Sequence, residues 1–314
     1  MKSQSTTEIQ AKFKWALDSF CSKLNKDEQV IAVILMGSLS YDQVWEKSDI
    51  DLKLIVKEQR LAKSTMSLIA HDVLINATID TRNDFKRWME GSVQGSIDHA
   101  ILVKSKLLFT KDPSLQQYFD DIGYVGERDR QLMLLQSGCR ALNLLSKVEK
   151  WCYVKADPTY SAFWMLKMVD TLADIEVMVN QEVPMRESVQ RALQYHPELF
   201  HAIYTEMICG KVDERKVRSG LVKINAYLNR QTERLFKPVL DYLRQEQEIR
   251  TISDIEARFE TIVSLDFGWL TLACDWLAEC GALIKVTAET KLTPRSNVQL
   301  EEPAYLCADG GQFI

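Results

Sequence analysis

Three stretches near the N-terminus have the apolar pattern of β-strands. Residues 33–36 are apolar and end at Gly37 and Ser38, and a second apolar stretch begins at Ile50 after a polar spacer. In a third stretch, residues 73–81, apolar and polar side chains alternate from Ile75 to Asp80. Because strands that are buried on one face show this period of two, we expect a strand, a tight turn with a short helix, a second strand and later a third.

A helical period precedes this predicted sheet and then dominates the chain. Apolar side chains recur at helical spacing over residues 6–25, so an amphipathic helix is expected before the first strand. We also predict a helix over residues 61–70, between the second and third strands. From Glu127 to Glu248 the pattern is helical almost throughout, broken at prolines and at Gly210. This predicts a bundle of about five helices.

The C-terminal part of the chain changes character again. Helices are expected at residues 253–259 and 269–280, followed by strand-like segments at 283–289 and 303–308 that a polar loop separates. Two helices followed by a two-stranded wing are typical of a winged helix.

The predicted fold class is therefore α+β, with three domains along the chain. We expect a mixed sheet in residues 1–121, a helical bundle in residues 127–248 and a small winged-helix-like domain in residues 250–314. The length of 314 residues and the hydrophobic content of 46% allow each domain a core of its own.

Composition narrows the classes of partner. The net charge of −5 arises from 44 acidic and 39 basic residues, without the basic excess that a nucleic-acid backbone attracts. The seven cysteines are odd in number and form no CxxC pair, which fits reduced thiols rather than disulfides or zinc ligands. We find neither an N-terminal signal pattern nor a long apolar segment, so we expect a cytoplasmic protein without a membrane span.

The candidate chemistry lies where the second strand begins. Asp49 and Asp51 are two residues apart, so in a strand they share one face while Ile50 points into the core. Two adjacent carboxylates repel each other unless a cation lies between them, and Mg²⁺ prefers such oxygen ligands and keeps positions open for substrate phosphates. The turn at Gly37 and Ser38 offers backbone N–H groups and a hydroxyl that a phosphate can approach closely.

A further carboxylate lies in the third predicted strand. The polar face of this strand carries Leu74, Asn76, Thr78 and Asp80. If the second and third strands are neighbours, we expect Asp80 to converge with Asp49 and Asp51.

The Gly-Ser turn, the spacer and the double aspartate together resemble the signature of the DNA polymerase β-like nucleotidyltransferase superfamily. The resemblance covers roughly the first 110 residues and is greatest to small bacterial nucleotidyltransferases of the aminoglycoside and lincosamide type, which have a helical second domain. It implies that Gly37 and Ser38 contact the triphosphate of an NTP and that Asp49 and Asp51 bind Mg²⁺.

The resemblance also implies a third acid on a neighbouring strand, for which Asp80, Asp72 and Asp84 are candidates. We choose Asp80, on strand alternation, as a ligand of a second metal ion or as the general base. Lys53 lies two residues beyond Asp51 on the same face and would offset charge near the phosphates.

The function that follows is metal-dependent transfer of a nucleoside monophosphate from an NTP to a hydroxyl, which we expect to belong to a small molecule. The alternative is a nucleotide-sensing regulatory or binding protein with a degenerate nucleotidyltransferase domain and a winged helix that contacts DNA or a protein. Residues 269–280 contain Asp275 and Glu279 and no basic residue, which disfavours DNA and favours an interdomain or homodimer contact.

Overall fold

The structure is a computed structural model that divides into two compact units, Met1–Gly126 and Glu127–Ile314. It describes residues 6–41, 45–91, 102–103, 105–121, 126–293 and 295–308. The chain has a mixed sheet in its N-terminal part, helices in the middle and a small sheet at the C-terminus, which confirms the predicted α+β class. Within the described ranges, none of the helices combines the length and the apolarity needed to cross a membrane.

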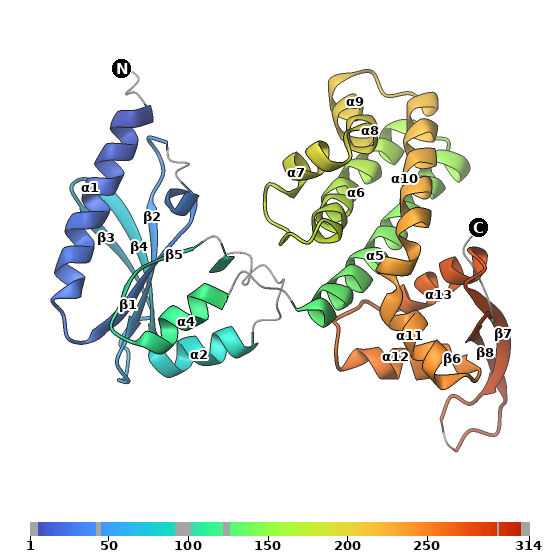
Figure 1. The fold of residues 1–314 in the computed structure, drawn as a ribbon. Coiled ribbons are helices and arrows are strands. Elements are labelled where there is room, and N and C mark those ends of the chain that lie inside the picture. Colours follow the sequence, from blue (N-terminus) through green and yellow to red (C-terminus); the bar gives the residue numbers. More distant parts are fainter. Residues whose placement is uncertain are drawn as a thin grey trace. The chain divides into compact units, whose positions relative to one another are not determined.

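The N-terminal unit is built on a five-stranded mixed sheet (Figure 1). In spatial order its strands are β3 (Thr65–Ala70), β4 (Val73–Thr81), β2 (Ile50–Val56), β1 (Val30–Met36) and β5 (Lys106–Thr110). The pair of β2 and β4 is parallel, and the other three pairs are antiparallel. The second and third strands predicted from the sequence are thus neighbours, and their polar faces lie on the same side of the sheet.

Helices cover both faces of this sheet. α1 (Thr6–Asn25) packs on the face that carries Ile50, where its apolar side chains join the strands in one hydrophobic cluster. α2 (Arg82–Gly91) and α4 (Pro113–Asp121) pack on the other face around Ile55, near the C-terminal end of β2 (Figure 1). The beginning of β2 therefore lies outside the part of this face that α2 and α4 cover.

The helix predicted over residues 61–70 is wrong, because this stretch contains the edge strand β3. β3 pairs with β4 through a hairpin turn at His71 and Asp72, whose φ angles are 48° and 59°. Two consecutive residues with positive φ give a turn whose twist matches that of the paired strands. The short apolar run Leu68-Ile69 fits the period of a strand as well as that of a helix. The hairpin turn therefore determines that this stretch forms a strand.

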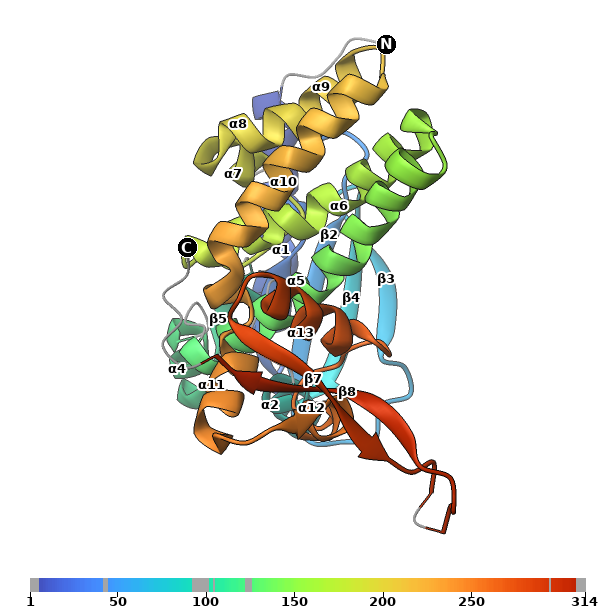
Figure 2. The same cartoon turned by 90° about the vertical axis from the view of Figure 1, so that its right-hand side faces the viewer.

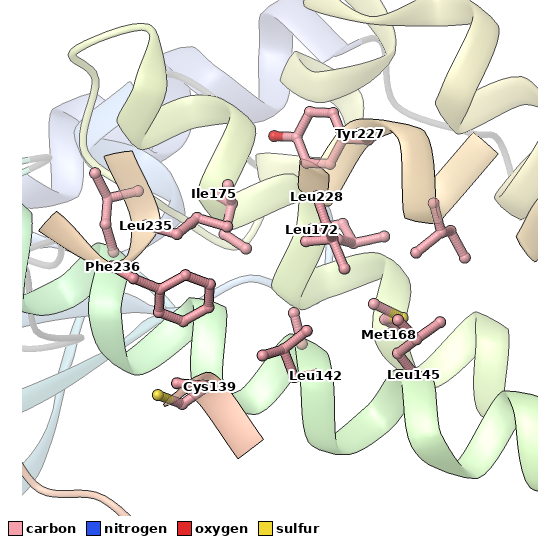
Figure 3. Close-up of a cluster of buried hydrophobic side chains, with 14 of the residues drawn as sticks. Cys139, Leu142, Leu145, Met168, Leu172, Ile175, Tyr227, Leu228, Leu235 and Phe236 are labelled. Atoms are coloured by element: carbon pink, nitrogen blue, oxygen red, sulfur yellow. The ribbon is translucent and has the colours of Figure 1, made fainter. Parts of the chain in front are cut away.

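The C-terminal unit is mainly helical, as the sequence predicted. Its long helices are α5 (Glu127–Glu149), α6 (Pro158–Val179) and α10 (Glu214–Leu235). Figure 3 shows how their side chains, among them Leu142 and Leu172, meet in a buried cluster. Its shorter helices are α7 (Ser188–Tyr195), α8 (Pro197–Phe200), α9 (Glu206–Cys209) and α11 (Lys237–Glu246), and π-helical turns follow α5 and α8 at Lys150–Val154 and His201–Thr205.

The end of the chain forms a small three-stranded sheet with two helices. The elements in chain order are β6 (Arg250–Thr251), α12 (Ile252–Glu260), α13 (Trp269–Glu279), β7 (Leu283–Thr290) and β8 (Leu300–Cys307). The strands lie in the order β6, β8, β7, and Figure 2 shows the β7 and β8 hairpin extending past the helices. The sequence does not predict β6, because two residues are too few to show a period.

One hydrophobic cluster runs through the whole C-terminal unit. It includes Leu134 of α5, Leu277 of α13 and the fully buried Tyr305 of β8. The structure separates the two units between Gly126 and Glu127. The further boundary near residue 250 and the winged-helix interpretation stay predictions.

An ion pair joins the beginning of α2 to the turn before α4. Arg82 Nε donates to Asp112 Oδ2, and Arg82 Nη2 donates to Ser114 Oγ at 3.2 Å. The Ser114 hydroxyl and backbone N–H donate to Asp112 Oδ1 at 2.8 and 3.0 Å. The Arg82 hydrogen bond, assisted by those from Ser114, lowers the pKa of Asp112 from 3.8 to about 2.

This lowered pKa predicts a loss of stability in acid. Asp112 stabilises the folded state above pH 3.8, and this contribution disappears as the pH falls from about 4 to about 2. We expect Asp112→Asn to lower the free energy of unfolding by about 1–2 kcal/mol at pH 6 and by a much smaller amount at pH 2, where the carboxyl group is about half protonated in the folded state. Urea unfolding at both pH values measures this. Asp241→Asn, which breaks the exposed ion pair with Lys237, is the control and should show a much smaller change. Equal losses for the two variants would contradict the prediction.

Candidate active site

The polar face of the sheet brings Asp49, Asp51 and Asn76 together. Asp51 of β2 lies directly opposite Asn76 of the parallel strand β4. The Asn76 side chain donates from Nδ2 to Asp49 Oδ2 at 2.6 Å and accepts at Oδ1 from Ser67 Oγ of β3 at 3.2 Å. The Asn76 amide therefore connects the aspartate pair to the edge strand.

Gly37 lies against the second aspartate, just after β1. Its φ of 69° belongs to the left-handed region, and a Cβ at Gly37 would lie 2.3 Å from Asp51 Oδ2. The Gly37 carbonyl accepts from the Ser40 N–H at 3.1 Å and from Ser40 Oγ at 2.7 Å, within the 3₁₀ turn Ser38–Tyr41. Ser38 contributes its backbone to this turn, and its side chain lies outside the described part. Only glycine fits this backbone and leaves the Asp51 carboxylate in place.

Lys53 lies on the same face, two residues beyond Asp51. Its Nζ donates to Asp80 Oδ2 at 2.6 Å and lies 4.5 Å from the centroid of the Trp88 ring. Only 12% of the Lys53 side chain and 26% of the Asp80 side chain are exposed. Lys53 is thus held between an acid of β4 and an aromatic ring of α2.

The structure does not bring Asp80 to the aspartate pair. Asp80 lies opposite Ile55, four residues beyond Asn76 along β4. At about 3.3 Å per residue this places it roughly 13 Å along the strand from the level of Asp51. The prediction that Asp80 shares a face with the pair is consistent with its contact to Lys53. The role of Asp80 as a metal ligand or general base stays a prediction. The register of β4 against β2 does not support this role.

The other candidate acids also have positions of their own. Asp72 lies in the hairpin turn, and Asp84 of α2 accepts from Thr81 Oγ1 at 2.8 Å. Among the described residues there is no group of three or more His, Cys, Asp or Glu side chains that could hold a metal ion. Asp49 and Asp51 are therefore the two acids around which a site can be built.

Apolar side chains border these acids on the same face. Leu74 precedes Asn76 by two residues in β4, and Ile69 of β3 lies opposite Leu74. Both are exposed, Leu74 to 45% and Ile69 to 75%. The face thus presents carboxylates and apolar surface side by side.

Sequence analysis missed Asn76 and Trp88 as members of this region. Asn76 already stood on the predicted polar face of its strand, but only the pairing of β2 with β4 places it beside Asp51. Trp88 lies on α2, and no sequence signal relates it to Lys53, since the contact joins separate elements.

The donor set of the aspartate pair fits a divalent cation. Asp49 and Asp51 offer carboxylate oxygens, the ligands that Mg²⁺ prefers in proteins. Two carboxylates match the double charge of one such ion. These residues would hold it beside the Gly37 backbone.

The segment that contains Asp49 and Asp51 is similar to known proteins. Residues 20–114 match the family model described as polymerase beta, nucleotidyltransferase. The fold is similar to the crystal structure of a nucleotidyltransferase-like protein from Exiguobacterium sibiricum 255-15, with a TM-score of 0.61 and 11% sequence identity over 94% of this chain and 99% of that chain. No curated protein matches the sequence significantly.

The segment of residues 20–114 in the N-terminal unit therefore belongs to the DNA polymerase β-like nucleotidyltransferase superfamily, which confirms the family that the Gly37 to Asp51 motif predicted. The match supports a nucleotidyltransferase-type activity. At 11% identity the structural likeness shows the fold alone. The closer resemblance to aminoglycoside and lincosamide nucleotidyltransferases stays a prediction.

Proposed function

We propose that the protein transfers a nucleoside monophosphate from an NTP to a hydroxyl of a small molecule, with Mg²⁺ held by Asp49 and Asp51. The observation that carries this proposal is the position of the Asp51 carboxylate beside the Gly37 backbone, with Asp49 two residues before it, inside the segment that matches the nucleotidyltransferase model. The motif and the sheet that orients it support the same reaction class.

Each residue of the site has a part in the proposed reaction. A divalent cation, when bound, neutralises phosphate charge and favours attack at the α-phosphorus. Asp49 and Asp51 would hold it, and the bare Gly37 backbone would let the triphosphate lie close to Asp51. Lys53 would offset phosphate charge, and its ion pair with Asp80 and its contact with Trp88 would position the ammonium group.

The net charge of the chain bears on the nature of the acceptor. The acidic and basic residues are nearly balanced, and the excess of acid disfavours a long phosphate backbone as substrate. The apolar pair Ile69 and Leu74 beside the acids suits an acceptor or base with an apolar part. A small hydroxyl compound therefore fits better than a nucleic acid. The cytoplasmic location and the homodimer stay predictions.

Incubation with each of the four NTPs, Mg²⁺ and a panel of hydroxyl compounds tests the proposal. The panel begins with aminoglycosides and lincosamides, because the resemblance points to them. We expect pyrophosphate release and a labelled product that require both Mg²⁺ and an acceptor, and that EDTA abolishes. Nucleotide binding without pyrophosphate release for every NTP and acceptor would contradict transfer.

A second candidate function is favoured by one observation, the absence of a third carboxylate beside Asp49 and Asp51 among the described residues. Such a site could bind nucleotide and act as a sensor, with the C-terminal sheet and helices contacting a partner. DNA is a poor choice of partner, because Lys285 of β7 is paired with Asp275 at 2.6 Å. Nucleotide binding without turnover, together with salt-sensitive retention of DNA, would favour the sensor that contacts DNA.

The role of Asp80 can be separated from that of the aspartate pair by Asp80→Asn. We expect the affinity for Mn²⁺ to stay within about twofold, because Asp80 lies far along the strand from Asp51. We expect the free energy of unfolding to fall by about 1–2 kcal/mol, because Lys53 loses its counter-ion in a largely enclosed place. Mn²⁺ titration and urea unfolding measure the two effects, with Asp84→Asn as the control. A tenfold loss of Mn²⁺ affinity would instead make Asp80 a metal ligand.

A further inference from the structure

The residue beside Asp51 on the neighbouring strand β4 is Asn76, whose side chain is an amide. We infer that Asn76 makes this a site for a single divalent cation, in which the Asn76 amide, and not a second cation, fixes Asp49. This inference rests on the proposed function, since it concerns the same pair of aspartates.

Hydrogen bonds fix the orientation of the Asn76 amide. Its Nδ2 lies 2.6 Å from Asp49 Oδ2, so an N–H group donates to the carboxylate. The opposite orientation of the amide would place its oxygen against the carboxylate oxygen, where two acceptors repel. The Ser67 hydroxyl donates to the remaining Oδ1 at 3.2 Å. The neutral amide of Asn76 in β4 thus holds Asp49 in place.

The charge on this face limits the number of cations that it can bind. Asp49 and Asp51 carry two negative charges, which one divalent cation neutralises. A second cation would need a further acid close by, and Asn76 is neutral. Lys53, the next residue of β2 on this face, adds no negative charge that a second cation could use.

Asp80 is the acid of β4 that could have supplied negative charge for a second cation. Asp80 is on the right face of β4, but its carboxylate is bound to Lys53 at 2.6 Å. The pair of Lys53 and Asp80 is neutral as a whole. No described group of three acids offers another arrangement.

The test counts the ions bound by the full chain. Mn²⁺ is titrated into the protein in the presence of an α,β-methylene analogue of each NTP, and free Mn²⁺ is followed by electron paramagnetic resonance. We expect one Mn²⁺ per protein and nucleotide complex for the natural sequence, and two for Asn76→Asp. Thr78→Asp is the matched control, since it adds the same charge to the same face, beside Lys53. We expect this control to keep one Mn²⁺.

A second readout needs neither nucleotide nor activity. In Asn76→Asp a carboxylate replaces the amide close to Asp49, so the variant should unfold at lower urea concentration without metal. Mg²⁺ should then stabilise Asn76→Asp more than the natural protein, because it binds the folded state with three acids more tightly.

The outcomes separate this inference from the proposed function. Two Mn²⁺ ions in the natural protein would overturn the single-cation site and leave the proposed transfer intact. One Mn²⁺ in both the natural protein and Asn76→Asp, with no added stabilisation by Mg²⁺, would remove the part assigned to Asn76. A nucleotide complex that binds no Mn²⁺ would defeat the inference and the proposed function together.

Discussion

Asp49→Asn and Asp51→Asn are each expected to reduce pyrophosphate release by about 10²–10³-fold or more, because each removes a charged ligand worth several kcal/mol in the transition state. Asparagine keeps the shape of aspartate, so the fold should stay intact. Initial rates at saturating NTP and Mg²⁺ measure the effect, and circular dichroism checks the fold.

The control for these variants is Asp72→Asn, which changes an exposed acid in the hairpin turn of the same unit. We expect its rate to equal that of the natural protein. Full activity in Asp49→Asn or Asp51→Asn would show that the reaction does not depend on the pair. Equal losses in all three variants would indicate that the change in net charge, and not the loss of metal binding, lowers the rate.

The second large effect is expected for Gly37→Ala. The new methyl group would lie 2.3 Å from Asp51 Oδ2, so the carboxylate must move. Displacement of a catalytic group by about 1 Å can cost roughly 10²-fold in rate. The positive φ of Gly37 adds a cost of about 1–2 kcal/mol to the folded state. We therefore expect a steep fall in the rate of pyrophosphate release and in the Mn²⁺ affinity. The free energy of unfolding should fall only moderately.

Gly281→Ala separates the two causes. Gly281 has a similar φ of 75°, but a Cβ there would meet no atom within 4 Å. We expect Gly281→Ala to lose only the unfolding free energy that positive φ costs an alanine, about 1–2 kcal/mol, and to keep its activity and its Mn²⁺ affinity. Activity retained in Gly37→Ala would show that Asp51 can move without consequence.

Local patterns were enough for much of the fold. The helix predicted over residues 6–25 coincides with α1, and the strand predicted over residues 73–81 coincides with β4. The helical period also identified the region between Glu127 and Glu248. The prediction failed over residues 61–70, because a short apolar run at a sheet edge carries no clear period and the turn at His71 has no glycine to mark it.

The sequence by itself determined the central motif. The period of two in a strand places Asp49 and Asp51 on one face, and the tight turn after an apolar strand calls for Gly37, whose backbone has positive φ. Both are local properties of the chain.

Only the tertiary structure decided what lies beside the two aspartates. Asn76 and Asp80 both stand on the polar face of β4, and the alternation of side chains does not distinguish them. The parallel register of β4 against β2 places the Asn76 amide next to Asp51 and leaves Asp80 to pair with Lys53. That register depends on contacts between strands that are distant in sequence, because a shift by two residues along the strand keeps the same face while it changes every neighbour.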